Sequence, residues 1–151
     1  MAQTIASLVV DASVVVKWKI TTEDYAREAE DLLLDWRYHR VQLLAPHLLP
    51  AEVMSAFLRA HRRGRVSEDE AKEAMQDLLA LPFVLFDVAP LAIRALALAQ
   101  QHNQRSYDCF YVALAERESV ELWTGDQRLY NAVRGPCACM RWIADYQRRR
   151  P

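Results

Sequence analysis

Four acidic side chains stand out among the twenty Asp and Glu residues because their neighbours in the sequence are apolar. They are Asp11, Glu52, Asp108 and Asp126. The first directly follows an apolar run, the last closes a short turn after another such run, and the other two fall where first turns of helices are expected. Each alone could cap a helix or complement its dipole. Four carboxylates gathered in one partly buried cleft, however, would repel one another and lose hydration unless a cation compensated them.

An all-oxygen, carboxylate-rich site selects hard divalent ions, Mg²⁺ or Mn²⁺, rather than zinc. Such an ion keeps coordination positions for water and for phosphate oxygens. Two ions about 3.5–4 Å apart stabilise the attacking and leaving oxygens in phosphodiester hydrolysis. The four acids therefore indicate metal-dependent chemistry on phosphate esters, provided that the fold brings them together.

Other phosphate and nucleotide chemistries lack their residues. A phosphatase of the haloacid dehalogenase type needs a second Asp two residues after its nucleophile, and Ser13 stands at that position after Asp11. A dinucleotide fold needs a glycine-rich turn after the first strand, where this chain has no glycine. The chain also has no P-loop and no Gly-x-Ser-x-Gly elbow. A metal-dependent nuclease remains.

Short apolar runs alternate with amphipathic segments along the chain. The predicted strands are Ile5–Val10, Gln42–Ala45, Phe83–Val88, Val120–Trp123 and Ala138–Trp142. The predicted helices are Glu23–His39, with Tyr25 on its buried face, Pro50–Arg63, Ser67–Leu81, Pro90–His102, Tyr107–Glu118 with Ser106 as its cap, and Asp126–Val133. This alternation predicts an α/β fold with a parallel sheet covered on both faces. Ligands of such sheets bind at the carboxyl ends of the strands, where Asp11 and Asp126 are expected.

Length and composition predict a single domain. The chain has 151 residues with 52% apolar side chains and a net charge of −1, which excludes a disordered chain. We expect the domain to span residues 1–146 and the basic segment 147–151 to be a disordered tail. The three cysteines, Cys109, Cys137 and Cys139, are odd in number, and we expect neither a disulfide framework nor a zinc site. No apolar run is long enough to span a bilayer or resembles a signal peptide, so we expect a cytoplasmic protein without membrane contact.

Four segments resemble the PIN-domain ribonucleases and, more narrowly, the VapC toxins of toxin–antitoxin pairs. They are Val9–Trp18, Pro50–Val53, Tyr107–Glu116 and Thr124–Leu129. They occur in the order and at the spacing of that family, and the likeness covers essentially the whole chain. By position, Asp11, Glu52, Asp108 and Asp126 match the family's acidic metal-site residues, and Ser13 and Thr124 match hydroxyl positions beside them. Ser55 departs from the Asn that many relatives have three residues after the Glu.

The resemblance implies a three-layer α/β/α sandwich around a parallel sheet of about five strands. It also implies cleavage of RNA, usually tRNA or ribosomal RNA, that depends on Mg²⁺ or Mn²⁺. A small antitoxin would inhibit the protein by occupying the acidic cleft, and a homodimer would be expected.

Substrate contacts are predicted from positions close to the expected cleft. These residues are Lys17, Arg105, Tyr107 and Arg128. Three arginines near Gly64, Arg62, Arg63 and Arg65, could also bind phosphate, but a solvated helix end or an antitoxin contact is the favoured explanation. Two other functions stay open: a non-catalytic PIN-like module that binds RNA or protein, and a metal-dependent phosphatase or DNA nuclease that uses the same acids.

Overall fold

The computed structural model describes residues 5–149 and contains a five-stranded parallel sheet. Strand β1 (Ala6–Val10) lies at its centre, between β2 (Val41–Pro46) and β4 (Glu121–Thr124). Strand β3 (Val84–Phe86) extends the sheet beyond β2, and β5 (Met140–Trp142) extends it beyond β4. The predicted parallel sheet of about five strands is confirmed.

The central strand is buried because helices cover both faces of the sheet. Val9 and Val10 have no exposed surface, and Val9 pairs with Leu44 on one side and Leu122 on the other. Apolar residues on both faces of a strand are typical of a parallel sheet between two helical layers. Because β1 is packed on both faces, its carboxyl end holds the residue that follows it in a fixed position.

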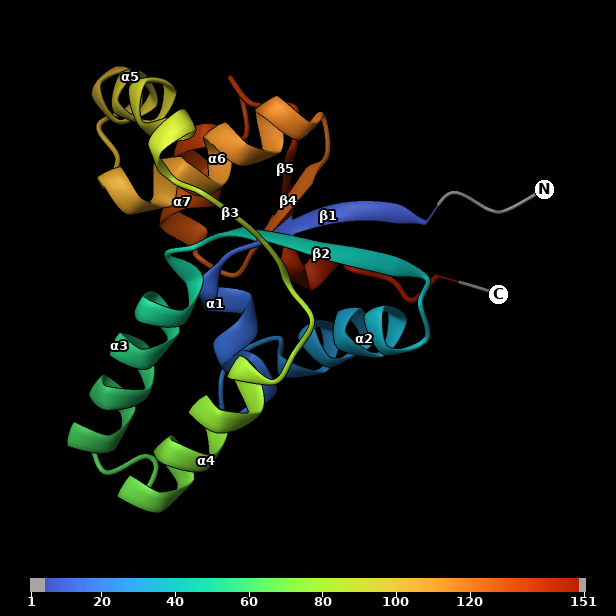
Figure 1. Cartoon of the computed structure of the whole chain (residues 1–151), viewed down its shortest axis with the longest axis vertical. Coiled ribbons are helices and arrows are strands. Elements are labelled where there is room, and N and C mark those ends of the chain that lie inside the picture. The colour runs from blue at the N-terminus through green and yellow to red at the C-terminus, as the bar shows by residue number, and fades with distance from the viewer. Residues whose placement is uncertain (1–4, 150–151) are drawn as a thin grey trace.

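Seven helices surround the sheet in two layers (Figure 1). One side carries α5 (Ala92–His102), α6 (Ser106–Glu118) and α7 (Gln127–Val133). The other side carries α1 (Ala12–Val15), α2 (Ala26–Arg37), α3 (Leu49–Arg62) and α4 (Glu68–Leu79). Helices α3 and α4 contact each other as a hairpin that extends away from the sheet (Figure 1). The α/β/α arrangement predicted from the family resemblance is confirmed.

Local sequence signals explain several helix ends. Pro50 lies in the first turn of α3, and Gly64 follows its end at a φ of +69°, which glycine adopts without strain. Ser67 and Glu70 form the reciprocal hydrogen bonds of a capping box at the start of α4. These local signals set the end of α3 and the start of α4 without the help of contacts to the sheet.

Two helix starts differ from the prediction. Ser106 is the first residue of α6 rather than its cap, because Arg105 has the extended backbone of the N-cap position. Helix α2 begins at Ala26, and Tyr25 lies before it at a φ of 60° with 44% of its surface exposed. Tyr25 instead packs edge-on against Trp142 of β5. In addition, α1 was not predicted, since its four residues are too few for a periodic pattern.

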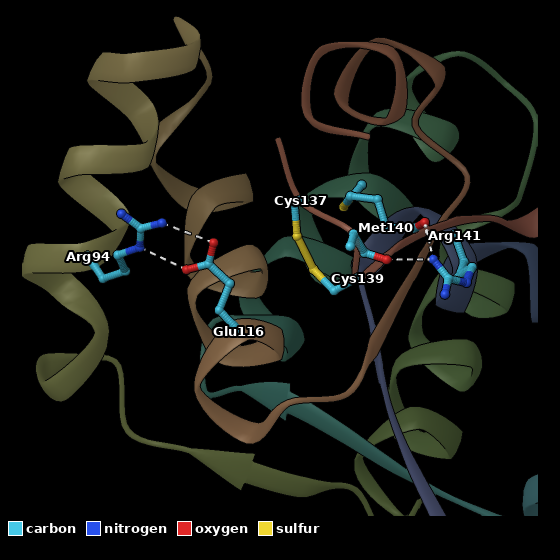
Figure 2. Close-up of a disulfide and its surroundings, with 7 residues drawn as sticks. Arg94, Glu116, Cys137, Cys139, Met140 and Arg141 are labelled. Carbon is cyan, nitrogen blue, oxygen red and sulfur yellow. Dashed lines mark hydrogen bonds and ion pairs between the residues drawn. A yellow bond between two sulfur atoms is a disulfide. The ribbon is translucent and has the colours of Figure 1, made fainter. Parts of the chain in front are cut away.

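The expectation that the cysteines form no disulfide was wrong. Cys137 and Cys139 form a disulfide just before β5, and Figure 2 shows it close to Arg141. Cys109 is the free cysteine of the described residues and is buried in α6.

Figure 2 also shows the ion pair in which Arg94 of α5 donates two hydrogen bonds to Glu116 of α6.

The end of the chain contacts the domain as far as it is described. The backbone amide of Arg149 donates to the Asp35 carboxylate at 2.7 Å. Residues 150–151 lie outside the described part, so disorder of the tail stays a prediction. Within residues 5–149, no helix has the length and apolar character needed to cross a membrane.

Candidate active site

The predicted acids meet at the point where the order of the strands in the sheet reverses. From β1 the chain builds outward to β2 and β3, whereas β4 and β5 lie on the opposite side of β1. The carboxyl ends of β1 and β4 therefore diverge into their following helices and leave a crevice between them. Asp11 follows β1 directly, and Thr124 ends β4.

Asp11 is a buried carboxylate held by hydroxyl groups. It is 6% exposed, and it caps α1 by accepting a hydrogen bond from the Ser13 amide. The Ser13 hydroxyl donates to Oδ1, and the Thr124 hydroxyl donates to Oδ2 at 2.5 Å. Burial raises the pKa of Asp11 to about 6, and the charges of Asp108 and Asp126 add to this rise, while the two hydroxyl groups oppose it.

The two hydroxyl groups are themselves oriented by the turn after β4. The Gly125 amide donates to the Ser13 hydroxyl at 2.8 Å, and the Asp126 amide donates to the Thr124 hydroxyl at 3.0 Å. Thr124 has no exposed surface. Both predicted hydroxyl residues are therefore brought to Asp11, in a network that joins the ends of β1 and β4.

Glu52 approaches the same crevice from the first turn of α3. Burial raises its pKa to about 7, and Asp108 and Asp11 add to the rise, while the Tyr111 hydroxyl and Arg59 oppose it. Both Glu52 Oε1 and the Tyr111 hydroxyl oxygen are buried without a hydrogen-bond partner. A buried acceptor left unpaired is costly, so this oxygen is suited to a ligand.

Asp108 and Asp126 share an arginine. Arg128 Nη2 lies 2.7 Å from Asp108 Oδ2 and 3.6 Å from Asp126 Oδ2. Asp126 also caps α7 by accepting from the Leu129 amide at 3.1 Å. Burial raises the pKa of Asp108, and Asp126 adds to the rise, while Arg128 and Arg105 oppose it. Helix capping and a place in the crevice are therefore compatible for Asp11 and for Asp126.

A cleft of about 300 Å³ is lined by all four acids and by several basic side chains. The basic residues that line it are Lys17, Arg59, Arg63, Arg65 and Arg105. Arg65 is already paired with Glu23 at 2.7 Å, whereas Lys17 lies 3.9 Å from that carboxylate. A cleft lined by both acidic and basic side chains can bind a metal and a phosphate side by side.

Gly125 makes room for Lys17. A Cβ atom at position 125 would lie 2.6 Å from Lys17 Cε and 3.4 Å from its Nζ, so a larger residue there would displace the lysine. Lys17 is 5% exposed although it carries a charge. The predicted contact residue therefore does reach the cleft, held there by the turn that also orients Ser13.

The other predicted contact residues are placed differently. Arg105 lines the cleft. Tyr107 is 58% exposed and, like Arg128, does not belong to the cleft lining found in the described residues. Arg128 instead lies against the carboxylates of the site. The contacts of these residues with a substrate stay predictions.

Sequence reasoning missed Tyr111, Arg59 and Gln104. Tyr111 is three residues after Asp108 in α6, and Arg59 is seven residues after Glu52 in α3. Residues at these spacings share a helix face, so helical periodicity counted from each acid would have found both. Gln104 lies in a loop and carried no such signal.

The residues fit a hard divalent ion by their chemistry. Buried carboxylates with raised pKa values and one unpaired buried oxygen form an all-oxygen donor set, in which burial outweighs the hydroxyl donors at Asp11 and the charge of Arg59 at Glu52. In the present arrangement of residues 5–149, no three Asp, Glu, His or Cys side chains are close enough together to ligate one ion. Two of the four acids are instead turned to Arg128.

A family model described as "PIN domain" matches residues 8–135. The chain belongs to the PIN-domain family. Over 95 residues it is 42% identical to "Ribonuclease VapC1" of Mycobacterium tuberculosis, an alignment that covers 62% of this chain and 69% of that relative. The predicted relationship to PIN-domain ribonucleases and VapC proteins is confirmed.

Two solved structures share the PIN-domain fold of this chain. The crystal structure of PAE2754 from Pyrobaculum aerophilum superposes with a TM-score of 0.65 at 24% identity and covers 91% of each chain. A toxin–antitoxin complex from Klebsiella pneumoniae gives a TM-score of 0.56 at 20% identity and covers 85% of this chain and 93% of the other. At these identities the likeness concerns the fold.

Proposed function

We propose that this protein is an endoribonuclease that acts as the toxin of a toxin–antitoxin pair and requires Mg²⁺ or Mn²⁺. The observation that carries the proposal is the buried Asp11 carboxylate, which accepts hydrogen bonds from two hydroxyl groups and an amide and lines the same cleft as Glu52 with its unpaired oxygen. The similarity to a VapC ribonuclease supports RNA as the substrate, and the toxin–antitoxin complex supports an antitoxin partner. Cleavage of tRNA or ribosomal RNA and a homodimeric state stay predictions.

Asp11, Asp108 and Asp126, completed by Glu52, would hold the ion. Once bound, the ion would supply an activated water and charge stabilisation for hydrolysis of a phosphodiester. Ser13 and Thr124 keep both oxygens of Asp11 fixed, which prevents the carboxylate from rotating away. Lys17 and Arg105 on the cleft wall would orient the phosphate before it reacts.

The presence of all four acids in one cleft argues against a non-catalytic module, since binding alone would not need buried carboxylates with raised pKa values. A DNA nuclease or phosphatase would use the same ion and the same phosphate contacts. Recognition of the sugar therefore decides between these activities.

The test compares RNA and DNA oligonucleotides of matched sequence, together with tRNA and ribosomal RNA, in Mg²⁺, in Mn²⁺ and in EDTA. We expect metal-dependent cleavage within RNA strands, no cleavage of DNA, and loss of activity in Asp108→Asn. Asp69→Asn, which changes an exposed acid of α4 outside the cleft, is the matched control and should retain activity. Full activity of Asp108→Asn or activity in EDTA would overturn the proposal, and equal cleavage of DNA would change the substrate class.

A further inference from the structure

Arg128 is partly exposed, but its guanidinium contacts the acids of the site. Its Nη2 donates to Asp108 Oδ2 at 2.7 Å, and its Nη1 donates to the Gln104 side-chain oxygen. Asp126 Oδ2 lies 3.6 Å from the same Nη2. The guanidinium is thus held from three sides, by residues of α6, of α7 and of the loop before α6.

The Gln104 side chain is oriented by backbone oxygens close to it in the chain. Its side-chain nitrogen donates to the backbone oxygens of His102 at 2.7 Å and of Asn103 at 3.1 Å. The amide oxygen is therefore presented to Arg128 as a fixed acceptor. Asn103 ends α5 in the left-handed conformation, which positions this loop beside α7.

The charges explain why the arginine lies there. Asp108 and Asp126 each carry a negative charge close to the buried Asp11 and Glu52, and Arg128 is the cation paired with both of them among the described residues. The guanidinium and a divalent ion would compete for the same oxygens, because Asp108 Oδ2 cannot accept from Arg128 at 2.7 Å and coordinate a metal in the same direction. Side-chain exposure of 43% gives Arg128 space to leave.

We propose that Arg128 is a resident counter-cation of the acidic cluster that a divalent ion must displace before the site can act. Because Asp108 and Asp126 are the metal ligands named above, this inference rests on the proposed function. Arg128 therefore weakens metal binding, although its charge stabilises the metal-free protein. Entry of the ion removes its partners and frees the guanidinium at the rim of the cleft.

Calorimetric titration with Mn²⁺ tests the competition directly. Arg128→Met should bind Mn²⁺ about three- to tenfold more tightly than the wild type, the range expected when one charge-assisted, partly exposed contact no longer competes. Gln104→Leu should shift the affinity in the same direction by a smaller factor, since it removes an anchor of the arginine. Arg134→Met is the matched control, because Arg134 lies at the end of α7 with its guanidinium over the Tyr130 ring. It should bind as the wild type does.

A second measurement follows the arginine itself. The side-chain ¹⁵N resonances of Arg128, assigned from their absence in Arg128→Met, should shift on addition of Mg²⁺, while those of Arg134 should not. Equal or weaker Mn²⁺ binding by Arg128→Met, or an unshifted Arg128 signal at saturating Mg²⁺, would overturn the inference. If one of these results is found but Asp11→Asn still abolishes Mn²⁺ binding, the proposed metal site remains supported and only the role of Arg128 is overturned. Absence of Mn²⁺ binding in every variant would overturn both.

Discussion

Two aspartates of this protein are almost fully buried, yet their surroundings differ completely. Asp35, on α2, has no exposed surface and is contacted by Arg40 at 3.1 Å and by the Tyr146 hydroxyl at 2.8 Å. The Arg149 amide and the Arg148 side chain also approach it. Asp11 receives hydrogen bonds from two hydroxyl groups and an amide, and the charges that face it are acidic.

Asp35 is a structural carboxylate, whereas Asp11 is available for a ligand. Asp35 carries its own counter-charges, so its burial ties the end of the chain to α2. Asp11 has fixed geometry but lacks a compensating cation, and a buried charge in that state is unfavourable until one arrives. Burial of an acidic side chain is therefore uninformative about function until its partners are known.

The largest expected effect is loss of activity on changing Asp11. Asp11→Asn keeps the shape and most hydrogen bonds of the side chain but removes its charge, so we expect RNA cleavage to fall by at least about a hundredfold. Folding should be preserved, since the variant no longer buries a carboxylate. Cleavage rates and urea unfolding on the same preparation measure both effects. If Asp11→Asn stays active or fails to fold, the proposed difference in role between Asp11 and Asp35 would be contradicted.

Asp35→Asn should show the opposite pattern. It leaves Arg40 without its partner and weakens the hold on Tyr146, so we expect the free energy of unfolding to fall by about 3 kcal/mol. Activity per folded molecule should not change, because Asp35 lies outside the cleft. Urea unfolding followed by fluorescence, with cleavage measured well below the transition, tests this. A loss of activity without a loss of stability would contradict the structural role.

The pH dependence of stability should reveal the uncompensated acids. The pKa values of Asp11 and Glu52 are about 6 and 7 in the folded protein and lie near 4 in the unfolded chain. The folded state therefore binds more protons, and the stabilisation present below pH 4 is lost as the pH rises through 7. For Asp11 this amounts to at most about 3 kcal/mol. Metal-free unfolding measured from pH 4.5 to 8 should show this decline, and Asp11→Asn should flatten it.

Metal binding should have the reverse dependence on pH. Carboxylates must lose their protons to bind an ion, so Mn²⁺ affinity should rise as the pH increases from 5 to 7 and then level off. The resulting stabilisation by Mn²⁺ should be larger at pH 8 than at pH 5. A pH-independent affinity would indicate that Asp11 and Glu52 are not ligands.

The smallest expected effect belongs to the hydroxyl that orients Asp11. Thr124→Val preserves the volume of a fully buried side chain but removes the donor to Asp11 and leaves the Asp126 amide without an acceptor. We expect about tenfold weaker Mn²⁺ binding and a loss of stability of about 1–2 kcal/mol. Thr124→Ser, which keeps the hydroxyl, should retain most of the affinity. Equal binding by the Val variant would show that Ser13 alone positions the carboxylate.

Much of the architecture could be predicted from short-range patterns. Apolar runs of strand length, the capping box at Ser67 and Gly64 after α3 each act within a few residues, so the alternation of strands and helices was correct. Features that depend on contacts between distant segments were missed. Tyr25 lies outside the helix and packs against Trp142, and Cys137 pairs with Cys139 despite a spacing that did not indicate a disulfide.

Residue types and spacing were enough to indicate which side chains could do chemistry: four acids in apolar surroundings, two of them after strands of a parallel sheet. How these acids are compensated depends on contacts that form in the folded protein. Ser13 and Thr124 are 111 residues apart and meet at Asp11 because β1 and β4 are neighbours. Arg128 contacts Asp108, twenty residues away, because the first turns of α6 and α7 meet at the crevice. Charge compensation depends on distance through space, which local sequence patterns do not encode.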